Sequence, residues 1–235
     1  MPTKTNLREP EKILVVDVGG HHVKIFATGA ASPRKLASGP HMTAREMVRG
    51  VRALAADWRF DAISIGYPGA VRHGVIAAEP ANLGKGWVGL DLAQAFGRRV
   101  KILNDAEMQA LGAYGGGHML FLGLGTGLGS AMIVAGHACP MELAHLPYKK
   151  GRTYEDYVGA RSLEHRGKKK WRRHVADVIA RLDAALQPDE IVIGGGNAKQ
   201  LRELPARARL GTNADAFTGG FRMWSSATRA ARATR

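Results

Sequence analysis

Cysteine is almost absent from this chain. The 235 residues include one, Cys139, so an internal disulfide is excluded and nothing favours an oxidising compartment. Long hydrophobic runs are also absent, because glycines divide the longest apolar stretch, residues 119–135, which is too short to cross a bilayer. The first residues, MPTKTNLREPEK, carry charges and no apolar centre, unlike a secretory signal. We therefore expect a cytoplasmic protein.

Acidic residues are scarce relative to basic ones. Lys and Arg number 34 against 20 Asp and Glu, which gives a formal charge of +14 and a pI near 10.3. Such an excess suggests a polyanionic partner: nucleic acid, inorganic polyphosphate, or a nucleotide with a phosphosugar. A solvated basic surface without a partner has the same composition. The length suits one large domain or two small ones that share an interface.

Thirty glycines stand mostly at the ends of predicted strands. Apolar periodicity predicts strands over residues 13–16, 23–27, 61–66, 71–77, 100–103, 119–122, 131–135 and 191–193. It predicts helices over residues 44–58, 90–96, 106–114, 154–159, 168–186, 197–201 and 214–235. An offset of 106 residues aligns Asp17 with Gly123 and Gly19 with Gly125. This suggests two similar α/β halves that face each other, although two unrelated glycine hairpins would look the same.

Two glycine turns join predicted strands, at residues 17–20 and 123–129. Glycine lets backbone N–H groups approach a phosphate closely. Asp17 adds a carboxylate suited to a hydrated Mg²⁺, and the Thr126 hydroxyl can donate to phosphate. A dinucleotide fingerprint would open a helix, whereas a strand follows here. No Gly-Lys-Ser/Thr ends either turn. One such turn alone is more often a plain hairpin.

Two further groups of residues suit phosphoryl transfer to a sugar. Asp105 follows a buried strand at the start of a helix, where it can deprotonate a hydroxyl in line with a phosphate; a helix N-cap is the alternative role. Glu142 and His145 can converge on neighbouring sugar hydroxyls, whereas a metal site would lack a visible third ligand. Three glycines at 194–196 offer a flat backbone surface for a nucleotide base or phosphate, or form only a tight turn.

The order of these elements resembles the ROK kinases of the actin/hexokinase superfamily. Asp-x-Gly-Gly, Asn-Asp-Ala, Gly-Thr-Gly-x-Gly, Glu-x-x-His and Gly-Gly-Gly follow one another in the family's sequence order. Residues 65–69 (IGYPG), 82–87 (NLGKGW) and 210–216 (LGTNADA) resemble further family loops. The resemblance extends over residues 13–224. The short length and the absence of a Cys-rich zinc motif are similar to the polyphosphate glucokinase branch, and no helix-turn-helix domain precedes residue 13.

The resemblance implies an α/β fold of two ribonuclease H-like lobes around a central cleft. Residues 1–115 would form the lobe with the catalytic Asp, and residues 116–235 the lobe with the second phosphate loop and the sugar-binding pair, its last helix packing back on the first lobe. It further implies Mg²⁺, a polyphosphate or ATP donor, no zinc, and often a homodimer. A small-molecule sugar and donor, rather than nucleic acid or a membrane, would be the partners.

The resemblance also assigns roles by position. Asp105 would be the base, and the sugar would contact Asn82, Asn104, Asp105, Glu142 and His145. The donor would contact Asp17, Gly19, Gly20, Lys24, Gly125, Thr126, Gly127, Gly195 and Gly196, with Asp17 holding Mg²⁺ through water. The acceptor would be the 6-hydroxyl of glucose or a similar hexose.

Two of the departures from the family pattern bear on the donor. His21 and His22 replace small or hydroxyl residues beside the first phosphate turn, which leaves the donor open. Residues 166–173 are densely cationic and suit a polyphosphate chain or a solvated helix face. A kinase for another sugar or polyol remains an alternative, as does a non-catalytic sugar- or nucleic-acid-binding protein on the same scaffold.

Overall fold

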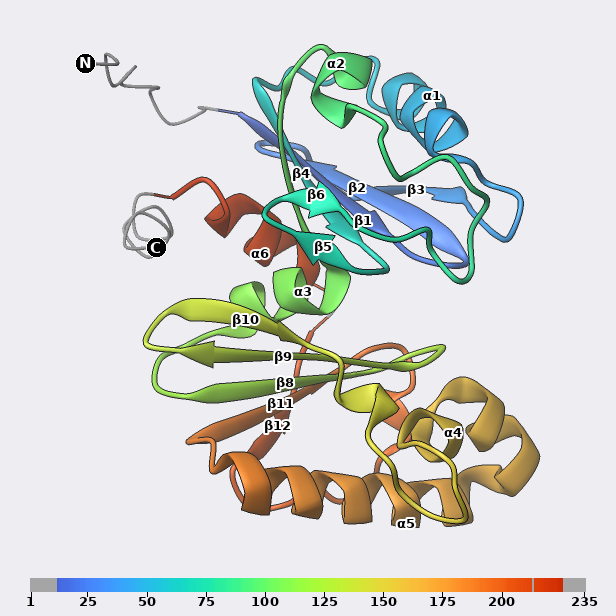
Figure 1. Cartoon of the computed structure of the whole chain (residues 1–235). Coiled ribbons are helices and arrows are strands. Elements are labelled where there is room, and N and C mark those ends of the chain that lie inside the picture. Colours follow the sequence, from blue (N-terminus) through green and yellow to red (C-terminus); the bar gives the residue numbers. More distant parts are fainter. Residues whose placement is uncertain (1–11, 213, 226–235) are drawn as a thin grey trace.

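The computed structural model describes residues 12–212 and 214–225, and two five-stranded sheets dominate it (Figure 1). The first sheet has the order β3-β2-β1-β4-β7. Its strands are β1 (Ile13–Val18), β2 (His22–Ala27), β3 (Arg34–Ala37), β4 (Ala62–Tyr67) and β7 (Arg99–Asn104). Strands β1, β4 and β7 run parallel, whereas β2 and β3 run antiparallel to their neighbours. Valine and isoleucine make β1 apolar on both faces, as expected of a strand covered on both sides.

The second sheet repeats this topology, with the order β10-β9-β8-β11-β12. Its strands are β8 (Met119–Leu124), β9 (Leu128–Val134), β10 (His137–Met141), β11 (Glu190–Gly194) and β12 (Ala208–Leu210). Adding 106 to the first and last residue numbers of β1 gives the first and last residue numbers of β8. The same offset takes the first residue of β2 to the first residue of β9. The predicted internal repeat is therefore confirmed as two sheets of equal connectivity.

Helix α3 (Asp105–Ala113) lies between the two sheets and packs on both (Figure 1). Alanines at i, i+4 and i+7 form the face toward the second sheet: Ala106, Ala110 and Ala113. The opposite face places Met108 and Leu111 in a cluster with strands of the first sheet. Small residues on one face allow close approach to β9, so the helix that follows β7 also sets the distance between the sheets.

Helix α6 (Asp215–Arg222) crosses α3 and covers β1 and β4 of the first sheet. Two glycines form the contact. A side chain at Gly219 would collide with the Met108 carbonyl oxygen, and one at Gly220 with the Val15 side chain. Beyond the helix, Trp224 donates from Nε1 to the buried Ser64 Oγ at 2.9 Å. The C-terminal segment thus returns to the first sheet.

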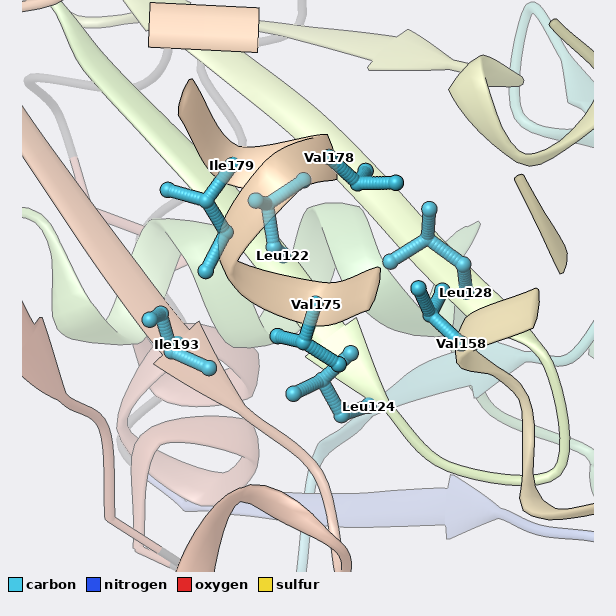
Figure 2. A pocket seen from close by; sticks show the side chains of 8 residues that line it. All are labelled: Leu122, Leu124, Leu128, Val158, Val175, Val178, Ile179 and Ile193. Atoms are coloured by element: carbon cyan, nitrogen blue, oxygen red, sulfur yellow. The ribbon is translucent and has the colours of Figure 1, made fainter. Parts of the chain in front are cut away.

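Helices cover the outer faces of both sheets (Figure 1). On the first sheet these are α1 (Ala44–Leu54), begun by a Thr43–Glu46 capping box, and α2 (Leu92–Phe96). On the second sheet they are α4 (Glu155–Val158) and α5 (Ala160–Leu186), which is kinked at Gly167 (φ 73°). Figure 2 shows the apolar layer between α5 and the second sheet, where a cavity of about 10 Å³ is too small for a ligand.

Several predicted elements differ from the structure. Residues 71–77 are a hairpin, β5 (Val71–Arg72) and β6 (Val75–Ile76), because His73 and Gly74 both adopt positive φ. Residues 197–201 form only a short 3₁₀ helix, η2 (Ala198–Gln200), and α5 begins eight residues before the predicted start. Strands β3, β10 and β12 were not predicted, because their alternation is weak. Of the predicted last helix, residues 226–235 lie outside the described part.

Within the described residues, no helix combines the length and the apolar character needed to cross a membrane.

Candidate active site

The carboxyl ends of three parallel strands meet at one edge of the first sheet. In register, Asp17 on β1 pairs with Gly66 on β4, and Gly66 pairs with Leu103 on β7. The chain then delivers Asn104 and Asp105. A side chain at Gly66 would collide with Met108 of α3 and would lie 3.6 Å from Asp105 Cα. Glycine at this position lets α3 begin directly over the strand ends, where ligands bind in open α/β sheets.

Asn104, not Asp105, caps helix α3. Its Oδ1 accepts from the Ala106 and Glu107 N–H groups at 2.9 and 3.3 Å, and its Nδ2 donates to the Gly69 carbonyl at 3.1 Å. Asp105 is the first helical residue, and its carboxylate accepts from the Ala106 N–H at 2.8 Å. The alternative role for Asp105, a plain N-cap, is therefore wrong because its neighbour already performs it.

The environment of Asp105 favours its protonated form. Burial, followed by the charge of Asp17 and more weakly that of Glu142, raises the pKa of Asp105 to about 7. Hydrogen bonding to the Ala106 N–H opposes this shift. A carboxylate with a pKa near neutral pH combines a useful ionised fraction with enough basicity to accept a proton from a hydroxyl.

Asp17 has one cationic neighbour, Lys24, which faces it across the β1–β2 hairpin. The Lys24 Nζ lies 3.5 Å from Asp17 Oδ2, and the Asp17 side chain is 14% exposed. Burial raises the pKa of Asp17, and Lys24 acts against that rise. With Asp105 nearby, the strand ends hold more negative than positive charge, which favours a bound cation.

The first glycine turn lies beside the loop that carries Asn82. The Gly19 N–H donates to the His22 carbonyl at 3.0 Å, and a side chain at Gly20 would lie 3.3 Å from Asn82 Cβ. His21 and His22 are exposed. The structure therefore brings Asn82 against the first glycine turn.

Glu79 holds the loop at residues 82–87 in place. Its carboxylate accepts from three consecutive N–H groups, those of Gly86, Trp87 and Val88, at 3.2–3.3 Å. Trp87 is fully buried and packs against Tyr67, with ring centroids 5.3 Å apart. The loop at residues 82–87 therefore contacts the segment at residues 65–69, which also resembles a family loop. Sequence reasoning missed Glu79, because no pattern shows that its carboxylate turns toward residues 86–88.

Glu142 and His145 form an exposed pair at the end of β10. His145 Nε2 lies 3.7 Å from Glu142 Oε2, across the short 3₁₀ helix η1 (Leu143–His145). Ser130 fixes this segment, because its buried hydroxyl donates to the Met141 carbonyl at 2.8 Å and accepts from the Leu143 N–H at 3.2 Å. After burial and the charge of Asp17, the charge of Glu142 also raises the pKa of Asp105, so Glu142 lies within electrostatic range of that carboxyl group.

The second glycine turn lies beside the triple glycine. The turn closes through a bond from the Gly125 N–H to the Gly127 carbonyl at 3.1 Å. Asn197, which follows the triple glycine, donates from Nδ2 to the Gly125 carbonyl at 3.1 Å. Gly195 has φ +84° and abuts Leu124, so only glycine fits there. Thr126, Gly195 and Gly196 are open to a ligand from this side.

Glu155 is a second positioning residue that sequence reasoning missed. Its Oε2 accepts from the Leu128 N–H at 3.2 Å and occupies the space that a side chain at Gly127 would fill. The turn is thereby joined to α4. Because the carboxylate accepts a backbone hydrogen bond from the residue that follows the turn, it helps to shape the loop.

The donor set at the strand ends fits Mg²⁺ better than a protein-enclosed metal. Among the described residues, no three His, Cys, Asp or Glu side chains gather closely enough to enclose an ion. Mg²⁺ commonly keeps several waters and uses one or two carboxylates together with substrate phosphates. Asp17, whose side chain is 14% exposed, lies beside the first glycine turn and could supply such a carboxylate.

Comparisons with known proteins agree with this geometry. No model of a protein family matches the chain. Polyphosphate glucokinase of Mycobacterium tuberculosis is 31% identical over 207 residues, which cover 80% of this chain and 73% of that protein. The protein of the same name from Mycobacterium leprae is 30% identical, and the match covers 60% of its length.

Solved structures share the fold over nearly the whole chain. The inorganic polyphosphate/ATP-glucomannokinase of Arthrobacter sp. strain KM has a TM-score of 0.77 at 22% identity, covering 97% of this chain and all of that one. A ROK family glucokinase from Streptomyces griseus, in complex with glucose and AMPPNP, has a TM-score of 0.72 at 17% identity, covering 94% and 99% of the two chains. Together with these mycobacterial relatives, the chain belongs to the polyphosphate glucokinase branch of the ROK family of sugar kinases.

Proposed function

We propose that the protein transfers a phosphoryl group from polyphosphate or ATP to the 6-hydroxyl of glucose, with Asp105 as general base. One observation carries this proposal: the carboxylate whose pKa is about 7 stands where the parallel strands of the first sheet end. The names of the mycobacterial relatives and of the Arthrobacter enzyme support the donor and the sugar.

In the proposed reaction, the sugar contacts Asn82, Asn104, Glu142 and His145. Asp105 accepts the proton of the sugar 6-hydroxyl while the oxygen of that hydroxyl bonds to the terminal phosphorus of the donor. The bond between this phosphorus and the oxygen of the leaving phosphate chain breaks. The donor phosphates contact the turns at residues 19–20 and 125–127, and a nucleotide would extend toward Gly195 and Gly196. Mg²⁺, held by Asp17 through water, would neutralise phosphate charge. Most of the catalysis is then positioning and charge neutralisation.

We propose further that residues 1–115 and 116–235 act as two lobes that close on the substrates and exclude water. Packing of α6 on β1 and β4 supports a return of the C-terminal segment to the first lobe. A cytoplasmic location and a homodimer are part of the same proposal.

The deciding experiment is a coupled assay for glucose 6-phosphate with Mg²⁺ and either ATP or long-chain polyphosphate. Asp105→Ala is the control, and it should fold and bind glucose while turnover falls by about 10²–10⁴-fold. Mannose, suggested by the Arthrobacter enzyme's name, is the second acceptor to test. Near-normal turnover in Asp105→Ala would contradict the proposed role of this residue as general base. If the wild type forms no glucose 6-phosphate with either donor, the proposed glucokinase activity is wrong.

A further inference from the structure

A groove of about 770 Å³ opens beside the second glycine turn, away from Asp105 and the sugar residues. Its walls come from the turn itself, the loop before α4, α4, and the start of α5. The lining residues are Thr126, Arg152, Glu155, Asp156, Gly159, Arg161, Ser162, His165 and Arg166. Thr126 belongs to both the turn and the groove, and the Ala160 N–H joins them by hydrogen bonds to the Gly125 and Thr126 carbonyls. The groove is therefore continuous with the proposed phosphate site.

The carboxylates in the groove are already occupied by backbone groups. Glu155 accepts from the Leu128 N–H, as described above, and Asp156 accepts from the Thr153 N–H at 2.9 Å and from its hydroxyl at 3.1 Å. The hydrogen bonds from Thr153, and more weakly the charges of Arg152 and Arg161, lower the pKa of Asp156.

The three arginines of the groove have no direct acidic partner. Among the described residues, Arg152, Arg161 and Arg166 form no salt bridge. The Arg166 guanidinium lies 4.4 Å from the centroid of the Tyr157 ring, which orients it. The groove thus offers three guanidinium groups and one imidazole to an anion.

Ser162 has an unmet hydrogen bond in the groove wall. The residue is 5% exposed, and its Oγ has no hydrogen-bond partner. A buried hydroxyl without a partner destabilises the folded state. An anionic ligand oxygen in the groove would accept the hydrogen bond from this hydroxyl.

A side-chain network pre-orders the loop that carries Arg152. Tyr148 donates its hydroxyl to Asp177 Oδ2 of α5 at 2.5 Å, and Lys149 Nζ lies 2.9 Å from the same oxygen. The loop closes through bonds from the Tyr148 N–H to the Arg152 carbonyl at 2.8 Å and from the Arg152 N–H to the Lys149 carbonyl at 3.0 Å. A loop fixed before binding costs less entropy when the ligand arrives.

We propose that this groove binds the polyphosphate units that lie beyond the one being transferred. The inference rests on the proposed function, and it assigns the direction in which the donor chain leaves the reaction centre. Guanidinium groups match phosphate oxygens in pairs, and a volume of about 770 Å³ is that of a small-molecule site. Nucleic acid fits less well, because no Phe, Tyr or Trp side chain lines the groove to stack with a base.

Not all of the basic segment at residues 166–173 takes part. Trp171 is fully buried, and Arg172 donates to the Gln200 carbonyl, so these two residues hold α5 in place. Lys168, Lys169 and Lys170 are exposed after the Gly167 kink. Only Arg166 of this segment lines the groove.

The test measures binding of long-chain polyphosphate without sugar, by titration calorimetry at several salt concentrations. We expect Arg161→Ala to bind about tenfold more weakly, with a salt slope shallower by about one. Arg45→Ala, an exposed arginine on α1, is the matched control and should bind as the wild type does. Equal losses in Arg161→Ala and Arg45→Ala would overturn the assignment, since they would reflect overall charge.

Ser162→Ala separates a ligand role from a structural one. The variant should unfold at the same or a higher temperature, because it removes an unsatisfied hydroxyl, yet bind polyphosphate several-fold more weakly. Unchanged affinity, or tighter binding of a single-stranded DNA oligonucleotide by the wild type, would overturn the proposal. The binding measurement does not depend on turnover, so the two proposals can fail separately. Polyphosphate binding without glucose phosphorylation would contradict only the proposed kinase activity. ATP-dependent glucose phosphorylation without polyphosphate binding would contradict only the proposed polyphosphate site in the groove.

Discussion

Asp17 acts on Asp105 across the first sheet, although the two residues stand at different strand ends with β4 between them. Burial, and after it the charge of Asp17, raises the pKa of Asp105, and the only cation paired with Asp17 in the described residues is Lys24. The same arrangement thus supplies a base with a pKa near neutrality and a negative site suited to a metal ion.

The pH dependence of the reaction should reflect Asp105. Only the ionised carboxylate accepts a proton, so kcat/KM for glucose should rise as the pH passes through about 7 and then level off. A coupled assay over pH 5–9 with saturating donor measures this. A profile that is flat from pH 5 to 8 would contradict the shifted pKa.

Glu142→Gln should move that profile toward lower pH. Glu142 raises the pKa of Asp105 through its charge, so its removal lowers the pKa. The sugar contact proposed for Glu142 also predicts a higher KM for glucose, but a lost contact alone would leave the midpoint in place. The shift of the midpoint therefore distinguishes the electrostatic effect from the binding effect.

Stability should respond to pH in the opposite direction to activity. The pKa of Asp105 is about 7 in the folded protein and near 3.8 when unfolded. Unfolding therefore releases a proton between pH 4 and 7, and the wild type loses stability over this window as the pH rises. Asp105→Asn should be equally stable below pH 4 and more stable above pH 7, by at most roughly 4 kcal/mol. Chemical denaturation of both proteins at pH 4 and pH 8 measures the difference, and an equal difference at both pH values would contradict it.

Gly219→Ala should destabilise the protein by about 1–3 kcal/mol or more, because its methyl group would collide with the Met108 carbonyl of α3. Gly115→Ala is the matched control, since a side chain there meets nothing within 4 Å. Thermal unfolding measures both variants. If their melting temperatures fall equally, the close contact of α6 with α3 is not what holds this segment.

Glu79→Gln should raise the KM for glucose by roughly fivefold and leave kcat nearly unchanged. The substitution removes the charged acceptor of the three N–H groups at residues 86–88. The bound conformation of the loop that carries Asn82 then becomes less favourable by about 1 kcal/mol. Glu203→Gln, an exposed glutamate of the second half, controls for the lost charge. An unchanged KM would show that the loop holds its shape without Glu79.

The sequence by itself determined the repeat, the glycine turns and the position of Asp105. These features are local or periodic: apolar strands end in glycines, and the second hairpin follows the first at an interval of 106 residues. Their order along the chain was enough to identify the family. Weakly alternating strands such as β12, and the hairpin at His73 and Gly74, lacked such a pattern and were missed or misread.

Only the tertiary structure decided how these residues act together. Asp105 and Asn104 are equally good caps by residue type, and the contact of Asn104 with Gly69 decides between them. The pKa of Asp105 depends on burial and on Asp17, which stands on another strand. The groove at Thr126 joins residues of a turn, a loop and a helix, and the unpaired state of Ser162 depends on everything packed around it. Burial and electrostatic interaction are properties of neighbours in space, which a linear pattern does not contain.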